Sequence, residues 1–69
     1  MIKVRSLVNT DGDENTYFVA AFADTKAEVQ AGDPFVGLPE GATIEMGSRV
    51  MTAAGEVAFM KSNGTWNWV

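Results

Sequence analysis

The sequence predicts a mainly β fold, a small antiparallel sheet or meander of about five or six short strands with one short helix. Apolar and polar residues alternate near the N-terminus with the period of a half-buried strand. The C-terminal half contains short apolar segments separated by glycine-containing turns. One intervening stretch has the residue spacing of a capped helix. The 69 residues are enough for one domain, with an N-terminal hairpin (1–22), a helix and linker (23–41) and a C-terminal β-meander (42–69).

Two strand-like segments around a turn predict the N-terminal hairpin. In residues 2–8 an apolar face alternates with a more basic one, the first formed by Ile2, Val4 and Val8 and the second by Lys3, Arg5 and Leu7. Residues 17–22 are dense enough in apolar side chains to form a strand with both faces covered. The Asn, Asp and Gly residues between the two segments are typical of turns. We therefore expect an antiparallel hairpin with an acidic loop at its tip.

The middle of the chain predicts a helix followed by an irregular connection. Thr25 and Glu28 have the spacing of a capping box, residues 26–31 favour a helix, and Gly32 is placed to end it. Residues 32–41 contain both prolines, so we expect a connection without regular structure. The side chains predicted to hold this connection against the core are Phe35, Val36 and Leu38.

The C-terminal third predicts a meander whose strand segments are residues 43–46, 49–52, 56–61 and 65–69. Asn63-Gly64 is the sequence of a two-residue hairpin turn. Such a turn places Met60 opposite Asn67, Phe59 opposite Trp68 and Lys61 opposite Trp66. One face then carries Val57, Phe59, Lys61, Trp66 and Trp68, and the other carries Ala58, Met60, Asn67 and Val69.

Size and composition exclude several classes of site. The chain has no cysteine and no histidine, which excludes disulfides, Cys/His zinc sites and catalysis by a thiolate or an imidazole. A core this small rarely contributes more than about 3–5 kcal/mol, so we expect self-association to complete the fold, with a trimer favoured. We expect no cofactor and no enzymatic activity.

The charge balance argues against nucleic acid and membrane partners. Five Lys and Arg stand against nine Asp and Glu, a net charge of −4, and the cations are scattered along the chain. Phosphate-backbone binding depends on clustered cations. No apolar run approaches the roughly 20 residues of a membrane span, and Lys3 and Arg5 interrupt the start of any signal sequence. We therefore expect synthesis and assembly in a cytoplasm.

The candidate contact residues are aromatic or methionine side chains: Trp66, Trp68, Phe59 and Met60, supported by Tyr17 and Phe18. Three interpretations remain open at this point: an intramolecular core with Lys61 over Trp66, a subunit interface, or a flat platform that stacks on a ligand.

The acidic loop is the one stretch with a metal-like pattern. Asp11, Asp13 and Glu14 are spaced like the start of a calcium-binding loop, but Phe22 stands where the EF-hand pattern requires a glutamate. We interpret the segment as a solvated hairpin loop and predict no metal site.

Both ends of the chain resemble small virion structural proteins of tailed bacteriophages and prophages. The N-terminal part of the match is the basic and apolar strand "MIKVRSLVN", an acidic turn and "TYF". The C-terminal part consists of Gly47, Ser48, Thr52, Ala53, Gly55, Val57, Ser62, Gly64, Trp66 and Val69. Ala54 departs from the pattern, since the family has an acidic residue in that turn.

The resemblance implies a head-decoration, head-fibre or tail-associated component of the virion, oligomeric, assembled in the bacterial host cytoplasm and docked on a larger phage structural protein. It implies no catalytic residue. Two other functions stay open: a carbohydrate-binding module that uses Trp66 and Trp68, and an acidic inhibitor protein that occupies the basic groove of another protein.

Overall fold

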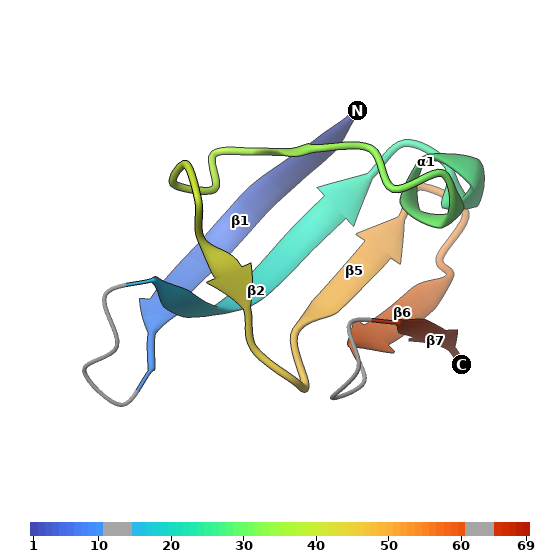
Figure 1. The fold of residues 1–69 in the computed structure, drawn as a ribbon. Helices are drawn as coiled ribbons and strands as arrows, with labels where there is room; N and C mark the ends of the chain where they lie inside the picture. The colour runs from blue at the N-terminus through green and yellow to red at the C-terminus, as the bar shows by residue number, and fades with distance from the viewer. Residues whose placement is uncertain (11–14, 61–64) are drawn as a thin grey trace.

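The structure, a computed structural model, describes residues 1–10, 15–60 and 65–69 and consists of one mixed sheet with a single short helix (Figure 1). The elements are β1 (Ile2–Asn9), β2 (Thr16–Ala23), α1 (Lys26–Gln30), β3 (Phe35–Val36), β4 (Thr43–Ile44), β5 (Arg49–Thr52), β6 (Val57–Met60) and β7 (Trp66–Trp68). The strand order is β3-β1-β2-β5-β6-β7, and β4 pairs with β2 outside this order. The prediction of a mainly β fold with one short helix is confirmed.

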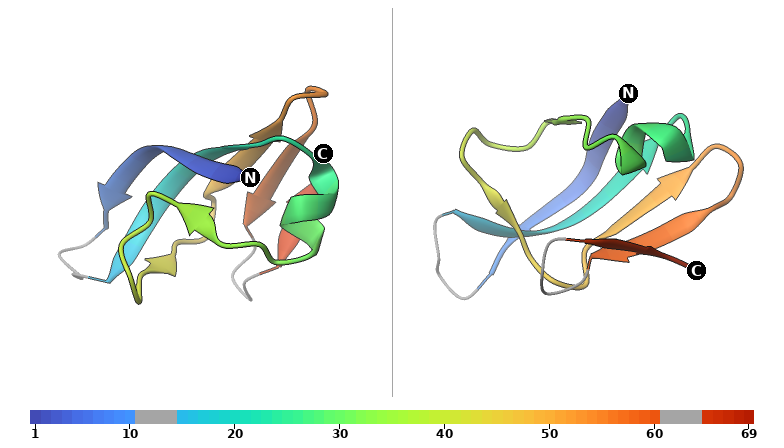
Figure 2. Two further views of the ribbon diagram at one scale, coloured as in Figure 1. Left: turned by 90° about the horizontal axis from the view of Figure 1, so that it is seen from above. Right: turned by 45° about the vertical axis from the view of Figure 1, so that its right-hand side comes forward.

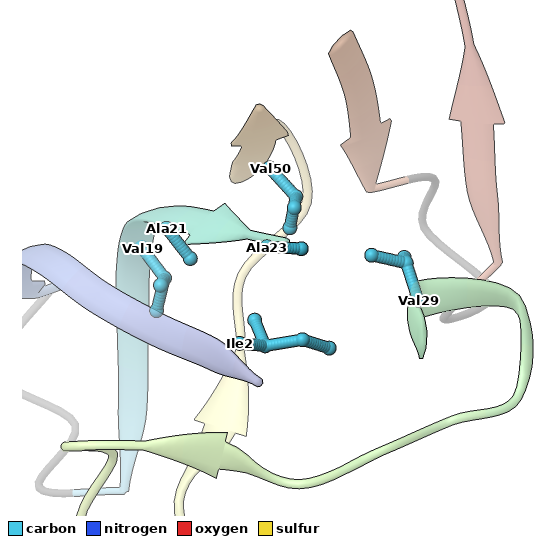
Figure 3. Close-up of a cluster of buried hydrophobic side chains, with 6 residues drawn as sticks. All are labelled: Ile2, Val19, Ala21, Ala23, Val29 and Val50. Atoms are coloured by element: carbon cyan, nitrogen blue, oxygen red, sulfur yellow. The ribbon is translucent and has the colours of Figure 1, made fainter. Parts of the chain in front are cut away.

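Only one face of the sheet is covered. Helix α1 and the connection 31–42 lie on one side of β1, β2 and β5, which we call the inner side (Figure 1, Figure 2). The short strands β3 and β4 pair with β1 and β2 and continue the sheet toward this side. The buried hydrophobic cluster lies between the helix, the connection and the sheet (Figure 3), and consists of Ile2, Val19, Ala21, Ala23, Val29 and Val50. The opposite face, which we call the outer face, has no covering layer among the described residues.

The N-terminal hairpin forms as predicted, but a β-bulge changes its faces. β1 and β2 are antiparallel, with a register shift between Val4 and Ser6. The bulge adds one residue to β1, so the alternation of side chains reverses after Val4. Leu7 therefore packs against the core and Val8 is 55% exposed. The prediction that Val8 shares a face with Ile2, and Leu7 with the basic side chains, was wrong for this reason.

β2 is the central strand of the sheet, and its two faces differ. Val19, Ala21 and Ala23 are buried, whereas Phe18 is 39% exposed and Phe22 is half-buried. The prediction that both faces of this strand are covered was wrong. Apolar side chains alone do not distinguish a covered face from one left open, and a chain of this size supplies one covering layer.

The two halves of the chain meet through parallel strands. β2 and β5 are parallel, with Ala21 opposite Val50, and the connection between them carries α1, β3 and β4 across the inner face. Two further short pairs, β1–β3 and β2–β4, are parallel as well. The sheet is thus mixed, and the antiparallel meander is limited to β5, β6 and β7.

Residues 43–46 were predicted as the first strand of that meander and instead lie against β2. The Glu45 amide donates a hydrogen bond of 2.7 Å to the Tyr17 carbonyl, while Gly47 (φ +92°) turns the chain toward β5. The positive φ of this glycine allows the sharp change of direction between β4 and β5.

Helix α1 confirms the predicted capping signal. Thr25 and Glu28 form the capping box, in which the Thr25 amide donates to the Glu28 carboxylate at 2.9 Å. Ala31 is the C-cap residue of the helix, and Gly32 after it has a φ of +77°. Val29 is the buried residue of the helix and anchors it to the sheet.

The connection after α1 is held partly as predicted. Phe35 and Leu38 are half-buried and pack against the core. Val36 is 50% exposed, so its predicted role in holding the connection was wrong. Because Phe35 and Val36 are consecutive residues of β3, only one of the two can face the core.

Candidate interaction surfaces

The register of the last hairpin separates residues that were predicted to lie together. Met60 is opposite Trp66, Phe59 is opposite Asn67 and Ala58 is opposite Trp68. This differs by one residue from the register of a two-residue turn, and a slip of one residue moves every side chain to the other face. Trp66 and Trp68 therefore share the inner face with Ala58 and Met60, and Phe59 points to the outer face. The predicted ladder of Phe59, Trp66 and Trp68 was wrong.

Burial of the two indoles gives a physical reason for this register. In the observed pairing both tryptophans extend the apolar core, whereas the alternative would place them on the uncovered face. The Asn63-Gly64 turn and the contact of Lys61 with Trp66 lie outside the described residues.

Each indole is covered by another side chain. The Trp66 ring stacks on Phe35 with 5.8 Å between centroids and 14° between planes. The Lys26 ammonium lies 4.9 Å from the centroid of the Trp68 ring, a cation–π contact. A cleft of about 500 Å³ opens beside them, between α1 and β7; its lining is Val29, Gln30, Gly32, Thr65, Trp66 and Trp68.

The outer face carries exposed apolar side chains mixed with cations. Phe18, Met51 and Phe59 are 39%, 48% and 40% exposed. The strand register brings Phe22 between Lys3 and Met51, and brings Arg49 between Ala20 and Phe59. The outer face as we use the term consists of Lys3, Arg5, Val8, Phe18, Ala20, Phe22, Arg49, Met51 and Phe59.

A groove of about 370 Å³ crosses the centre of the outer face. Its lining consists of Arg5, Ala20, Ala21, Phe22, Arg49 and Met51, and we call it the arginine groove. The guanidinium carbon of Arg5 lies 5.4 Å from the centroid of the Phe22 ring. The groove thus combines an apolar floor with two cationic groups.

The cations of the outer face have no acidic partner within residues 1–10, 15–60 and 65–69. The ion pairs in this part of the chain are those of the N-terminal ammonium of Met1 with Asp24 and with Glu28. The Glu56 carboxylate accepts a hydrogen bond from the Thr52 hydroxyl at 3.2 Å, away from the groove. The arginine groove is therefore a positive and apolar site on a chain whose net charge is −4.

The predicted contact residues divide between the two faces. Phe18 and Phe59 lie on the outer face and are exposed. Tyr17 is half-buried against the core, and Met60 is buried at 8% exposure. Tyr17 and Met60 lie on the inner side with Trp66 and Trp68. The predicted contact residues therefore form two separate groups, one on each face of the sheet.

Arg5, Phe22, Arg49 and Met51 were not predicted as site residues. Arg49 and Met51 alternate with the buried residues of β5, which is a signal for one shared exposed face. Their position beside Phe22 depends on the parallel pairing of β2 with β5, which the sequence does not indicate.

The described residues contain neither a cluster of metal-ligating side chains nor a membrane-spanning helix. In residues 1–10, 15–60 and 65–69, no three His, Cys, Asp or Glu side chains are grouped so as to hold a metal ion. The predicted loop with Asp11, Asp13 and Glu14 lies outside this part. No helix in the described part has the length and apolar character needed to cross a bilayer.

The chain matches no protein-family model, no curated protein sequence and no solved structure.

Proposed function

We propose that this protein is a non-enzymatic structural or assembly component of a tailed-bacteriophage virion, of the head-decoration, head-fibre or tail-associated kind. It acts by self-association and by docking on a larger structural protein. The outer face is the observation that carries this proposal, because it leaves Phe18, Met51 and Phe59 exposed around two arginines. Phe, Met and Arg are enriched at the centres of protein interfaces, where acidic residues are depleted. The resemblance of both chain ends to phage proteins supports the virion assignment.

The chemistry of the two grooves favours binding over catalysis. The described residues that line them contribute arginine, glutamine and threonine as polar side chains, and none is a carboxylate. In a chain without histidine or cysteine, a general acid or base would be drawn from Asp, Glu, Lys or Tyr, and none of these is among the described residues that line either groove.

Charge on the outer face restricts how copies can associate. If two outer faces met across a two-fold axis, Lys3, Arg5 and Arg49 of each copy would face the same cations of the other. Juxtaposed like charges at an interface are costly. Association in which the outer face of one copy meets a different surface of the next avoids this, and such contacts form a ring where the rotation closes and a filament where it does not. We therefore favour a trimer over a two-fold dimer.

Light scattering on a size-exclusion column, across a hundredfold dilution, tests the proposal. We expect a particle mass of three times the 7.4 kDa chain mass. The double variant Phe18→Ser and Phe59→Ser should shift the mass toward that of a monomer, because it removes two exposed rings of the outer face. Met46→Ser is the matched control, since Met46 is 57% exposed and lies outside the outer face. A wild-type monomer at every concentration would contradict the self-association.

A second candidate function is carbohydrate binding in the cleft between α1 and β7. The cleft places two indoles beside the Gln30 amide, a combination of stacking and hydrogen-bonding groups that suits a pyranose ring. Titration with cellotetraose, followed by the indole N–H signals of Trp66 and Trp68, tests this candidate. Indole signals that do not shift at millimolar sugar, together with strong protection from acrylamide quenching, would exclude it.

A further inference from the structure

The arginine groove presents two guanidinium groups, a chemistry suited to binding an anion. Arg5 and Arg49 line the same groove, and neither has an ion pair or a side-chain hydrogen bond within the described part of the chain. Guanidinium groups bind carboxylates through paired hydrogen bonds, and they tolerate partial burial better than an ammonium does. A carboxylate that enters between them would also contact Phe22 and Met51, so the expected occupant is an acidic segment with an apolar side chain.

The chain carries such a segment. Asp33 and Glu40 flank β3, both are exposed, and in the described part of the chain neither carboxylate accepts a hydrogen bond or forms an ion pair. Between them Val36 is 50% exposed on β3. Residues 33–40 thus present two free carboxylates and one exposed apolar side chain at the edge of the sheet.

We propose that the arginine groove of one copy binds residues 33–40 of a second copy, a contact that rests on the proposed self-association. Asp33 and Glu40 supply carboxylates to Arg5 and Arg49, and the exposed Val36 packs on the apolar floor of the groove. Opposite charges meet in a partly desolvated site, where they attract more strongly than on an open surface.

The two surfaces lie on the same side of the sheet, since Val36 is beside Lys3 and Lys3 is beside Phe22 of the groove. The groove is at the centre of the outer face, whereas β3 is at the end of the strand order beside β1. Two copies that exchanged this contact about a two-fold axis would bring their cationic outer faces together, so we favour the arrangement in which each copy uses its groove for one neighbour and residues 33–40 for the other. Such an arrangement forms a ring where its rotation closes, and three copies would give the trimer expected above.

Single-stranded nucleic acid is the main competing occupant of a face with cations and aromatic rings. It fits less well, because three cations on the outer face belong to a chain with a net charge of −4. Phosphate-backbone binding draws its affinity from many neutralised phosphates.

Charge reversal on both sides of the contact tests the proposal. The groove variant is Arg5→Glu with Arg49→Glu, the segment variant is Asp33→Arg with Glu40→Arg, and the combined variant carries all four changes. The combined variant has the same net charge as the wild type, so it also controls for overall charge. Gln30→Glu is the control for an added negative charge, since Gln30 is exposed on α1, outside the groove and outside residues 33–40.

We expect the groove variant and the segment variant each to raise the dissociation constant of the oligomer by about tenfold or more. The combined variant should return it to within about threefold of the wild type, and Gln30→Glu should change it by less than that. Circular dichroism of each variant checks that the fold is retained.

Each other outcome overturns the assignment in a distinguishable way. An oligomer that survives in the groove variant removes the groove from the contact, while dissociation of the Phe18→Ser and Phe59→Ser variant would still uphold the proposed function. Loss in both pair variants without recovery in the combined variant shows that the carboxylates come from elsewhere. Binding of a twelve-residue oligothymidylate that requires Arg49 assigns the groove to nucleic acid. A wild-type monomer ends both proposals.

Discussion

Replacing Trp66 by alanine should cost this domain most of its stability. Trp66 lies on the inner face and stacks on Phe35, with 5.8 Å between ring centroids. A tryptophan side chain buries about 150–250 Å² when fully covered. Half of that area, at about 25 cal/mol per Å², contributes about 2–3 kcal/mol. The stacked ring pair adds about 1 kcal/mol.

The expected loss of about 3–4 kcal/mol is close to the whole stability of a core this small, about 3–5 kcal/mol. Urea unfolding followed by far-UV circular dichroism measures it, at a protein concentration low enough to keep the chain monomeric. A thermal scan should show a decrease in Tm of more than about 15 °C, since about 1 kcal/mol corresponds to roughly 4–8 °C in a domain of this size. If the Trp66 variant does not fold, Phe35→Leu removes the stacking alone and should cost about 1 kcal/mol.

Phe59→Ala is the matched control, and it makes the experiment a test of the β6–β7 register. Phe59 is on the outer face, 40% exposed, beside Arg49 and Asn67. Its truncation removes cross-strand contacts and should cost about 1 kcal/mol or less. In the register of a two-residue turn Phe59 and Trp66 would share one face, and the two substitutions would cost similar amounts. Equal losses would therefore refute the observed register.

Three further substitutions test the core and one turn. Ser48→Ala should destabilise the domain by about 1–3 kcal/mol in urea unfolding, because the buried Ser48 hydroxyl accepts a 2.8 Å hydrogen bond from the Val19 amide; an unchanged midpoint would show that water satisfies this amide. Gly47→Ala should lower Tm by several degrees, a cost of about 1–2 kcal/mol, because Gly47 has a φ of +92° and a Cβ there would lie 3.4 Å from the Phe18 ring; an equal or higher Tm would contradict this. Val50→Ala should cost about 2–3 kcal/mol, since Val50 is fully buried on β5, and a loss below about 1 kcal/mol would show that the core collapses around the smaller side chain.

Local signals in the sequence predicted the elements that depend on local contacts. The hairpin of β1 and β2 follows from alternation and a polar turn, and α1 follows from the capping box of Thr25 and Glu28. In each case the residues that determine the structure lie within a few positions of one another. Capping and turn preferences contribute little free energy, but they act on the same residues that form the element.

The pairing of β2 with β5 could not be predicted in the same way. These strands are separated by α1, β3 and β4, and their parallel pairing depends on how that whole connection packs on the inner face. Hydrophobic periodicity identifies a strand and its buried face but does not name its neighbour. The arginine groove follows from this pairing, so the sequence did not indicate it.

The β6–β7 register and the bulge in β1 were also not predicted, and both are explained by burial of apolar side chains. Both concern a shift of one residue, and both were decided by which apolar side chains reach the core. The sequence Asn63-Gly64 favours a two-residue turn only through a local preference of the backbone. Burial of Trp66 and Trp68 contributes several kcal/mol, which is more than such a preference. At the bulge beside Val4, the extra residue allows Leu7 to face the core. In each case burial determines the register over the local preference.

The small size of the hydrophobic core connects the fold with the proposed assembly. Two of the six residues in the buried cluster are alanines. Helix α1 and the connection 31–42 cover the inner face, and no described segment covers the outer face. Phe18, Met51 and Phe59 therefore stay in water in the isolated chain. Their burial against another protein surface would add stability by mass action, because any partner that binds only the folded chain favours folding. In the proposed assembly, a sheet with one open apolar face and a pair of arginines without acidic partners in the described part of the chain would therefore be more stable than in the isolated chain.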